Sequence, residues 1–142
     1  MMDRVLVVAA ALLLVGTASH AQPNKEQYEL QERCGRRAAE FFDRVKKELQ
    51  SMEGPLRWFH STYQNHYNSR LNKCFILEDT IITADNDPSL DHSFSITDIN
   101  ENKKYGVYWG RNHVCWVSGK TKDCWPHTEE EWRELIKPFM ED

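Results

Sequence analysis

The sequence predicts an α+β fold, in which one long N-terminal helix packs on a mostly antiparallel sheet of five or six strands and a short helix ends the chain. Three observations predict it. Apolar residues recur every three or four positions over residues 25–52, the period of an amphipathic helix. Aromatic and β-branched segments separated by polar turns follow over residues 56–117. A capping sequence and a second helical stripe occupy residues 128–140.

Length and composition indicate one globular domain. The chain has 142 residues, of which 40% are hydrophobic and 28% are charged, values ordinary for a folded domain and too apolar for a disordered chain. The net charge is -4 and the pI is about 5.9. Because a nucleic-acid binder normally carries a basic excess that neutralises phosphates, we expect no nucleic-acid partner.

Residues 1–21 read as a signal peptide. An unbroken apolar run over residues 5–15 is followed by Ser19 and Ala21, small residues at positions -3 and -1 of a cleavage site. A membrane span needs about 20 apolar residues, so this run is too short for an anchor. We therefore expect a soluble periplasmic or secreted domain over residues 22–142, with no membrane anchor after cleavage. The alternative is an uncleaved N-terminal helix.

Four cysteines in an exported chain predict two disulfides. They are Cys34, Cys74, Cys115 and Cys124. A hairpin with a two-residue loop at 119–120 would place Cys115 opposite Cys124, with Cα atoms about 4.5 Å apart, near the lower limit for a disulfide. That pairing leaves Cys34 to join Cys74 and would tie the first helix to the sheet.

The predicted N-terminal helix presents one apolar stripe. Its members are Cys34, Ala38, Phe41, Phe42, Val45, Leu49 and Met52. Gly54 and Pro55 then supply a stop, because glycine favours a left-handed cap and proline cannot continue a helix. Cys34 belongs to the stripe, so we expect its thiol to face the core.

A β-hairpin is predicted next, with a turn at 68–70. Phe59, Tyr63 and Tyr67 share one face of the first strand. The same residues are four apart, which leaves a helix open, but the aromatic content favours a strand. The apolar segment over residues 71–83 is predicted to be the central strand.

The remaining elements follow from turn residues and alternation. Strands are predicted over 93–99, 105–109 and 114–117, with a loop at 85–89 and turns at 100–104 and 110–112. Thr128 and Glu131 form a capping box for the last helix, and Pro138 limits its length. The apolar face of that helix is Trp132, Leu135, Ile136 and Phe139.

Histidines are the first candidate for chemistry. His60 and His66 would point to the same side of a strand, but they are six residues apart, which is about 20 Å. They cannot share a metal in that conformation. A ribonuclease-like hydrolase site could still combine His60, His66 or His113 with Lys73, and this is the alternative function. The acidic segment around 85–91 lacks the spacing of a calcium loop, so no metal site is predicted.

Tryptophans are the second candidate. The chain has five tryptophans and five tyrosines, more aromatic surface than one small core needs. Trp58 and Trp109 fall outside the main apolar pattern and could form an exposed recognition surface. With His60 and His66, they are the predicted binding residues. The pattern favours a binding or accessory protein that recognises another protein or a small ligand, or else a purely structural subunit.

The segment NHYNSRLNKCF, at residues 65–75, together with YGVY at residues 105–108, resembles small exported bacterial proteins that are described only as hypothetical. The resemblance implies export and paired cysteines. It implies no activity and no cofactor, and no catalytic residue is assigned from it.

Overall fold

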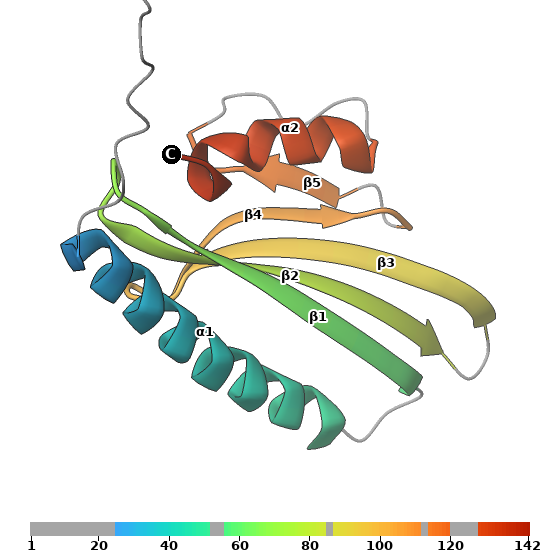
Figure 1. Ribbon diagram of the computed structural model, residues 1–142. Helices are drawn as coiled ribbons and strands as arrows, with labels where there is room; N and C mark the ends of the chain where they lie inside the picture. The colour runs from blue at the N-terminus through green and yellow to red at the C-terminus, as the bar shows by residue number, and fades with distance from the viewer. Residues whose placement is uncertain (1–24, 52–55, 85–86, 112–113, 120–127) are drawn as a thin grey trace, which may run out of the picture.

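The computed structural model describes residues 25–51, 56–84, 87–111, 114–119 and 128–142. In this part of the chain, one long helix is followed by five strands and a second helix (Figure 1). The elements are α1 (Lys25–Ser51), β1 (Leu56–Asn68), β2 (Lys73–Ala84), β3 (Asp87–Asp98), β4 (Lys103–Trp109), β5 (Val114–Val117) and α2 (Glu129–Met140). The predicted α+β class is confirmed, with a five-stranded antiparallel sheet.

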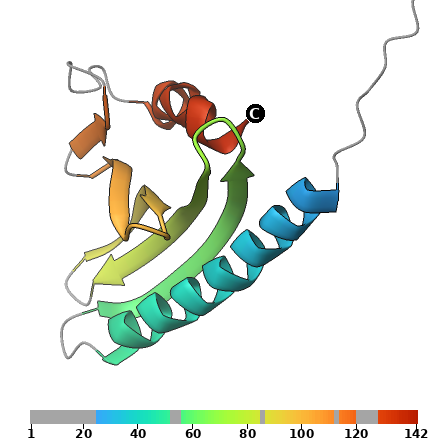
Figure 2. The same cartoon turned by 90° about the vertical axis from the view of Figure 1, so that its left-hand side faces the viewer.

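The sheet is a meander, since each strand pairs with its neighbours in sequence in the order β1-β2-β3-β4-β5. The long strands are visibly curved (Figure 2). β1 pairs with β2 from Leu56 opposite Ala84 to Asn68 opposite Lys73, so the strand prediction is right and the helical alternative is wrong. Asn72 closes the hairpin at a φ of 51°, a left-handed conformation that asparagine tolerates. β2 is an interior strand, although β3 is the central one.

β3 begins earlier than the sequence predicts. A loop was expected over residues 85–89, but Ala84 pairs with Asp87 and β3 starts there. Residues 85 and 86 lie outside the described residues. The prediction rested on turn-forming composition, and it failed because pairing with β2 satisfies backbone groups that a loop would leave to water. Pro88 is tolerated there because it lies near the start of the strand.

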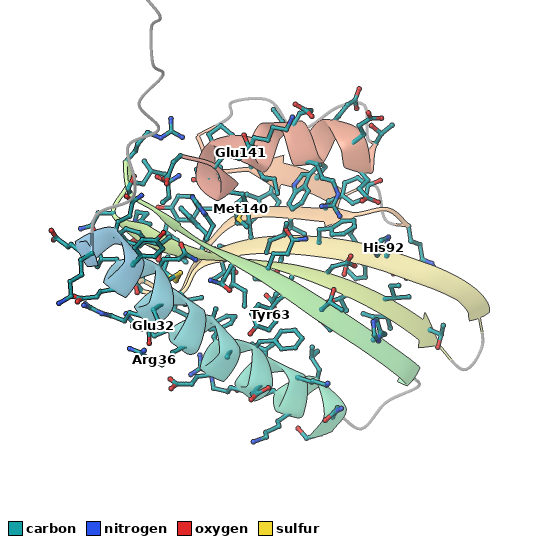
Figure 3. The ribbon with its side chains drawn as sticks, viewed as in Figure 1. Glu32, Arg36, Tyr63, His92, Met140 and Glu141 are labelled. Carbon is teal, nitrogen blue, oxygen red and sulfur yellow. A yellow bond between two sulfur atoms is a disulfide. The ribbon has the colours of Figure 1, made fainter. Side chains whose placement is uncertain are left out.

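α1 packs on one face of the sheet, mainly on β1 and β2. Cys34, Ala38 and Phe42 are the buried part of its stripe, and they join a cluster that includes Tyr67 and Ile76. Figure 3 labels Tyr63, whose ring lies between α1 and the strands, with its centroid 4.6 Å from that of Phe42.

The predicted disulfide between α1 and β2 is confirmed. Cys34 and Cys74 are bonded, with their Cα atoms 5.5 Å apart and a sequence separation of 40. By the chain-entropy model, a loop of this length contributes about 4 kcal/mol to stability. The other predicted bond involves Cys124, which lies outside the described residues, so it stays a prediction. None of the described cysteines is a free thiol.

α2 packs on the opposite face of the sheet. Neighbouring residues of a strand point to opposite sides, so Ile76 joins the α1 cluster while Phe75 and Leu77 join the α2 cluster. Thr128 and Glu131 form the predicted capping box, with Glu131 N donating to Thr128 Oγ1 at 3.2 Å. Trp132 and Ile136 are buried against the far side of the sheet. The ring of Trp132 stacks on Phe94 with centroids 5.8 Å apart. Figures 1 and 2 place the two helices on different sides of the strands.

The β1–β2 hairpin holds the C-terminal end of α2. Asn68 is fully buried, and its Nδ2 donates to the carbonyl oxygens of Pro138 at 3.1 Å and Glu141 at 3.0 Å. Its Oδ1 accepts from the backbone N–H of Leu71. One asparagine therefore satisfies carbonyls at the end of a helix, where no intrahelical donor remains. The segment NHYNSRLNKCF thus has a structural role in joining the hairpin to the chain end.

Candidate functional site

A groove lies between the C-terminal half of α1 and the sheet. α1 covers mainly β1 and β2, while the same sheet face continues across β3 and β4. The space left beside the helix has a volume of about 450 Å³. It is lined by Val45, Leu49, Glu78, Thr80, Ile82, Ser93, Phe94, Ser95, Lys104, Val107 and Trp109. We call this space the α1 groove.

Strand register explains the floor of the α1 groove. Glu78 on β2 is opposite Ser95 on β3, and Ser95 is opposite Val107 on β4. The next row, two residues along each strand, ends at Trp109. Alternate residues of a strand face one side, so these rows form one continuous surface. The opposite wall is apolar, because Val45 and Leu49 continue the stripe of α1.

Glu78 is the chemically distinctive residue of the floor. It is 9% exposed, and its Oε2 accepts a hydrogen bond from Ser95 Oγ at 3.0 Å. Burial raises the pKa of the Glu78 carboxyl above its ordinary value of 4.5, and the Ser95 bond and the Lys104 charge oppose that shift in part. None of the ion pairs found among the described residues includes Glu78. The groove therefore holds a carboxyl that is desolvated without a matched cation.

A second carboxylate lies beside one end of the groove. Asp91 is opposite Ile82, a groove residue, and is 8% exposed. Its Oδ2 accepts a hydrogen bond from Trp109 Nε1. Its Oδ1 is buried and has no hydrogen-bond partner among the described residues. The bond to Asp91 fixes the indole of Trp109, which remains 36% exposed at the rim.

The predicted binding residues are not gathered in one place. Trp109 lines the α1 groove. Trp58 lies on β1, where it pairs with Thr83 of β2, and its side chain lies outside the described part of the structure. His60 is exposed on β1, and His66 lies 3.5 Å from Asp142, between Nε2 and Oδ1.

The residues of the alternative hydrolase site hold ionic contacts of their own. Lys73 Nζ lies 2.7 Å from Asp98 Oδ2 and 2.7 Å from Glu101 Oε1. These two acceptors raise the pKa of the Lys73 ammonium, with Asp98 as the larger cause. His66 faces Asp142, whose pKa is lowered chiefly by the backbone N–H of Ser69. His113 lies outside the described residues.

His92, which sequence reasoning did not single out, lies on the α2 side of the sheet (Figure 3). Its Nε2 is 2.6 Å from Asp79 Oδ1, and its Nδ1 is 3.8 Å from Glu129 Oε2. Arg133 binds the other oxygen of Glu129 at 2.7 Å. The cluster ties the first turn of α2 to β2 and β3. No nucleophilic side chain is found among these contacts, so we assign it a structural role.

Sequence reasoning also missed the polar floor of the α1 groove. A signal was present, because Glu78 interrupts the apolar segment FILEDTII on the same strand face as Ile76 and Ile82. A charged residue on a face that is otherwise apolar either meets a partner or lines a cavity. The sequence could not distinguish these outcomes without the position of α1.

Among the described residues, no group of three or more histidine, cysteine, aspartate or glutamate side chains is placed to hold a metal ion. Neither α1 nor α2 combines the length and the apolar composition that a membrane-spanning helix needs.

Comparison of the chain with models of known protein families, with curated proteins and with solved structures finds no match.

Proposed function

We propose that this chain is a small exported binding protein and that its ligand site is the α1 groove. The observation that carries the proposal is a groove of about 450 Å³ with an apolar wall, an exposed tryptophan at its rim and a buried carboxyl on its floor. Small-molecule sites typically have volumes of about 300–1,000 Å³ and combine apolar walls with a few placed polar groups.

The groove is also suited to binding because its walls are fixed. The Cys34–Cys74 disulfide ties α1 to β2, and the rows of the floor belong to paired strands. A preorganised site loses less conformational entropy when a ligand binds. The disulfide fits an oxidising compartment, either the periplasm or the outside of the cell, and the proposed second bond between Cys115 and Cys124 fits the same location.

Binding is favoured over hydrolysis by the composition of the groove. No described histidine lines it. Its hydroxyl groups belong to Thr80, Ser93 and Ser95, and the base beside them is the Glu78 carboxyl, which accepts from Ser95 Oγ at 3.0 Å. A serine nucleophile also needs a third group that orients its base, and no such group is found beside Glu78 among the described groove residues.

The test uses a neutral fluorescent probe, N-phenyl-1-naphthylamine, whose emission rises in apolar surroundings. We expect saturable binding by the mature chain and an affinity loss of about tenfold or more in Trp109→Ala, because one aromatic anchor is typically worth over about 1.4 kcal/mol. Tyr28→Ala is the matched control, since Tyr28 is 63% exposed and lies outside the groove.

Circular dichroism spectra of both variants should match that of the parent chain, so that lost binding reports the groove. Absence of saturable binding, or an equal loss in Trp109→Ala and Tyr28→Ala, would refute the assignment of the site.

A further inference from the structure

We infer that the α1 groove selects a small organic cation, namely a protonated amine carried on an apolar body. This inference rests on the proposed function, because it names the ligand class of the same groove. Three features in and beside the groove carry it: a buried carboxyl on the floor, a neighbouring buried carboxylate oxygen without a hydrogen-bond partner among the described residues, and a partly exposed indole ring in the lining.

The first feature is the incomplete set of contacts around Glu78. Ser95 occupies Oε2, and no hydrogen bond found in the described residues involves Oε1. A carboxylate has room for about four hydrogen bonds, and its ionised form is costly to bury without a cation. An ammonium group carries several donors and a full charge, so it would supply what the floor lacks.

The second feature is Asp91. Its side chain is more than nine-tenths buried, and Oδ1 has no partner in the part of the chain that the structure describes, while Oδ2 holds the Trp109 indole. A buried acceptor left unpaired carries a free-energy cost in the unliganded protein. Asp91 is opposite Ile82 in the β2–β3 register, so this cost arises beside the groove rather than elsewhere in the fold.

The third feature is the ring of Trp109. The indole N–H is engaged with Asp91, so the ring has a fixed orientation and meets the groove with its carbon framework. Tryptophan is the aromatic side chain that attracts cations most strongly over its face. An ammonium near this ring would gain from the ring and from the carboxylates at the same time.

The charge balance of the groove favours a cation over an anion. Its lining contains one lysine, Lys104, which is exposed and acts on Glu78 without an ion pair. The opposing acidic groups are the Glu78 carboxyl in the lining and the Asp91 carboxyl, which lies beside the groove opposite Ile82. The last turn of α1, which carries Leu49 into the groove, has no basic residue to offset the negative end of the helix dipole. An anionic ligand would therefore meet uncompensated negative charge.

The experiment compares three probes that share a phenyl body and differ in charge: 2-phenylethylammonium, 2-phenylethanol and 3-phenylpropanoate. Calorimetric titration of the mature chain at pH 7 should give the tightest binding for the ammonium, by about tenfold or more over the alcohol, because hydrogen bonds to charged groups are the stronger ones. The propanoate should bind most weakly.

Glu78→Gln keeps the shape and removes the charge. We expect it to weaken ammonium binding by about tenfold or more, a larger loss than for the alcohol, which carries no charge to pair with Glu78. Glu40→Gln is the matched control, because Glu40 is an exposed residue of α1 that does not line the groove.

The outcomes separate this inference from the proposed function. Equal binding of the ammonium and the alcohol, tighter binding of the propanoate, or an unchanged ammonium affinity in Glu78→Gln would overturn the cation inference. Binding of any probe that is lost in Trp109→Ala would still support the groove as the site. Failure of all three probes and of the naphthylamine would overturn both.

Discussion

The two faces of the sheet are covered by helices in different ways. On the α2 face, Trp132 and Ile136 fill a closed cluster with residues from β2, β3 and β5. On the α1 face, Cys34, Ala38 and Phe42 close the core, and beyond them Val45 and Leu49 line the open groove. One face is therefore built mainly for stability, whereas the other retains buried carboxyl groups that lower stability.

This difference has a physical meaning. Buried charges without matched partners are rare in protein interiors, because desolvation outweighs what they contribute. Glu78 and Asp91 occur together on the face that also carries the α1 groove. Local costs of this kind are expected at functional sites, where the rest of the fold offsets them.

The largest loss of stability should come from a substitution on the α2 face. Trp132 is fully buried, and we expect Trp132→Ala to lower the free energy of unfolding by about 3–5 kcal/mol, the range for removing a large core side chain. Trp109→Ala should lower it by about 1 kcal/mol, because Trp109 is partly exposed. Urea denaturation followed by circular dichroism measures both. Equal losses would mean that Trp109 is a core residue.

An intermediate effect is expected where the hairpin holds α2. Asn68→Ala leaves the carbonyls of Pro138 and Glu141 without their side-chain donor, which should cost about 1–3 kcal/mol. Hydrogen exchange of α2 amides should rise as well. Ser69→Ala is the control, because its bond to Asp142 is exposed and should be worth about 0.5 kcal/mol or less. Similar losses in both variants would contradict the capping role of Asn68.

The smallest expected change in the free energy of unfolding should be an increase rather than a decrease. The pKa of Glu78 is raised in the folded chain, so the stabilising contribution of its neutral form is fully present below pH 4.5 and is lost as pH rises through the folded pKa. Glu78→Gln stays neutral throughout. It should therefore be more stable than the parent chain at pH 7, by about 1 kcal/mol, and equally stable below pH 4.5.

Urea denaturation between pH 4 and pH 7 checks this expectation, with Glu40→Gln as the exposed control that should show no such trend. If Glu78→Gln were less stable at pH 7, the Glu78 carboxylate would be stabilising the fold, and the contrast between the two faces would have to be abandoned.

The candidate site was only partly predictable from the sequence. Trp109 was singled out because it falls outside the core pattern, a local signal from alternation along a strand, and it is partly exposed in the groove lining. His60 and His66 were selected for their chemistry, and the structure places neither in the groove lining. Glu78 and Asp91 were missed, since their importance depends on which residues of other strands lie beside them.

The sequence by itself determined the elements and their local chemistry. The 3.6-residue period defined α1 and α2, the capping box defined the start of α2, and pairing Cys115 with Cys124 across a hairpin left Cys34 to bond with Cys74. These features depend on residues that are close in sequence or on one geometric constraint. Tertiary structure alone decided that the helices cover opposite faces and that α1 stops short of β3 and β4. The groove arises from that offset between packed layers, and no local pattern encodes the offset.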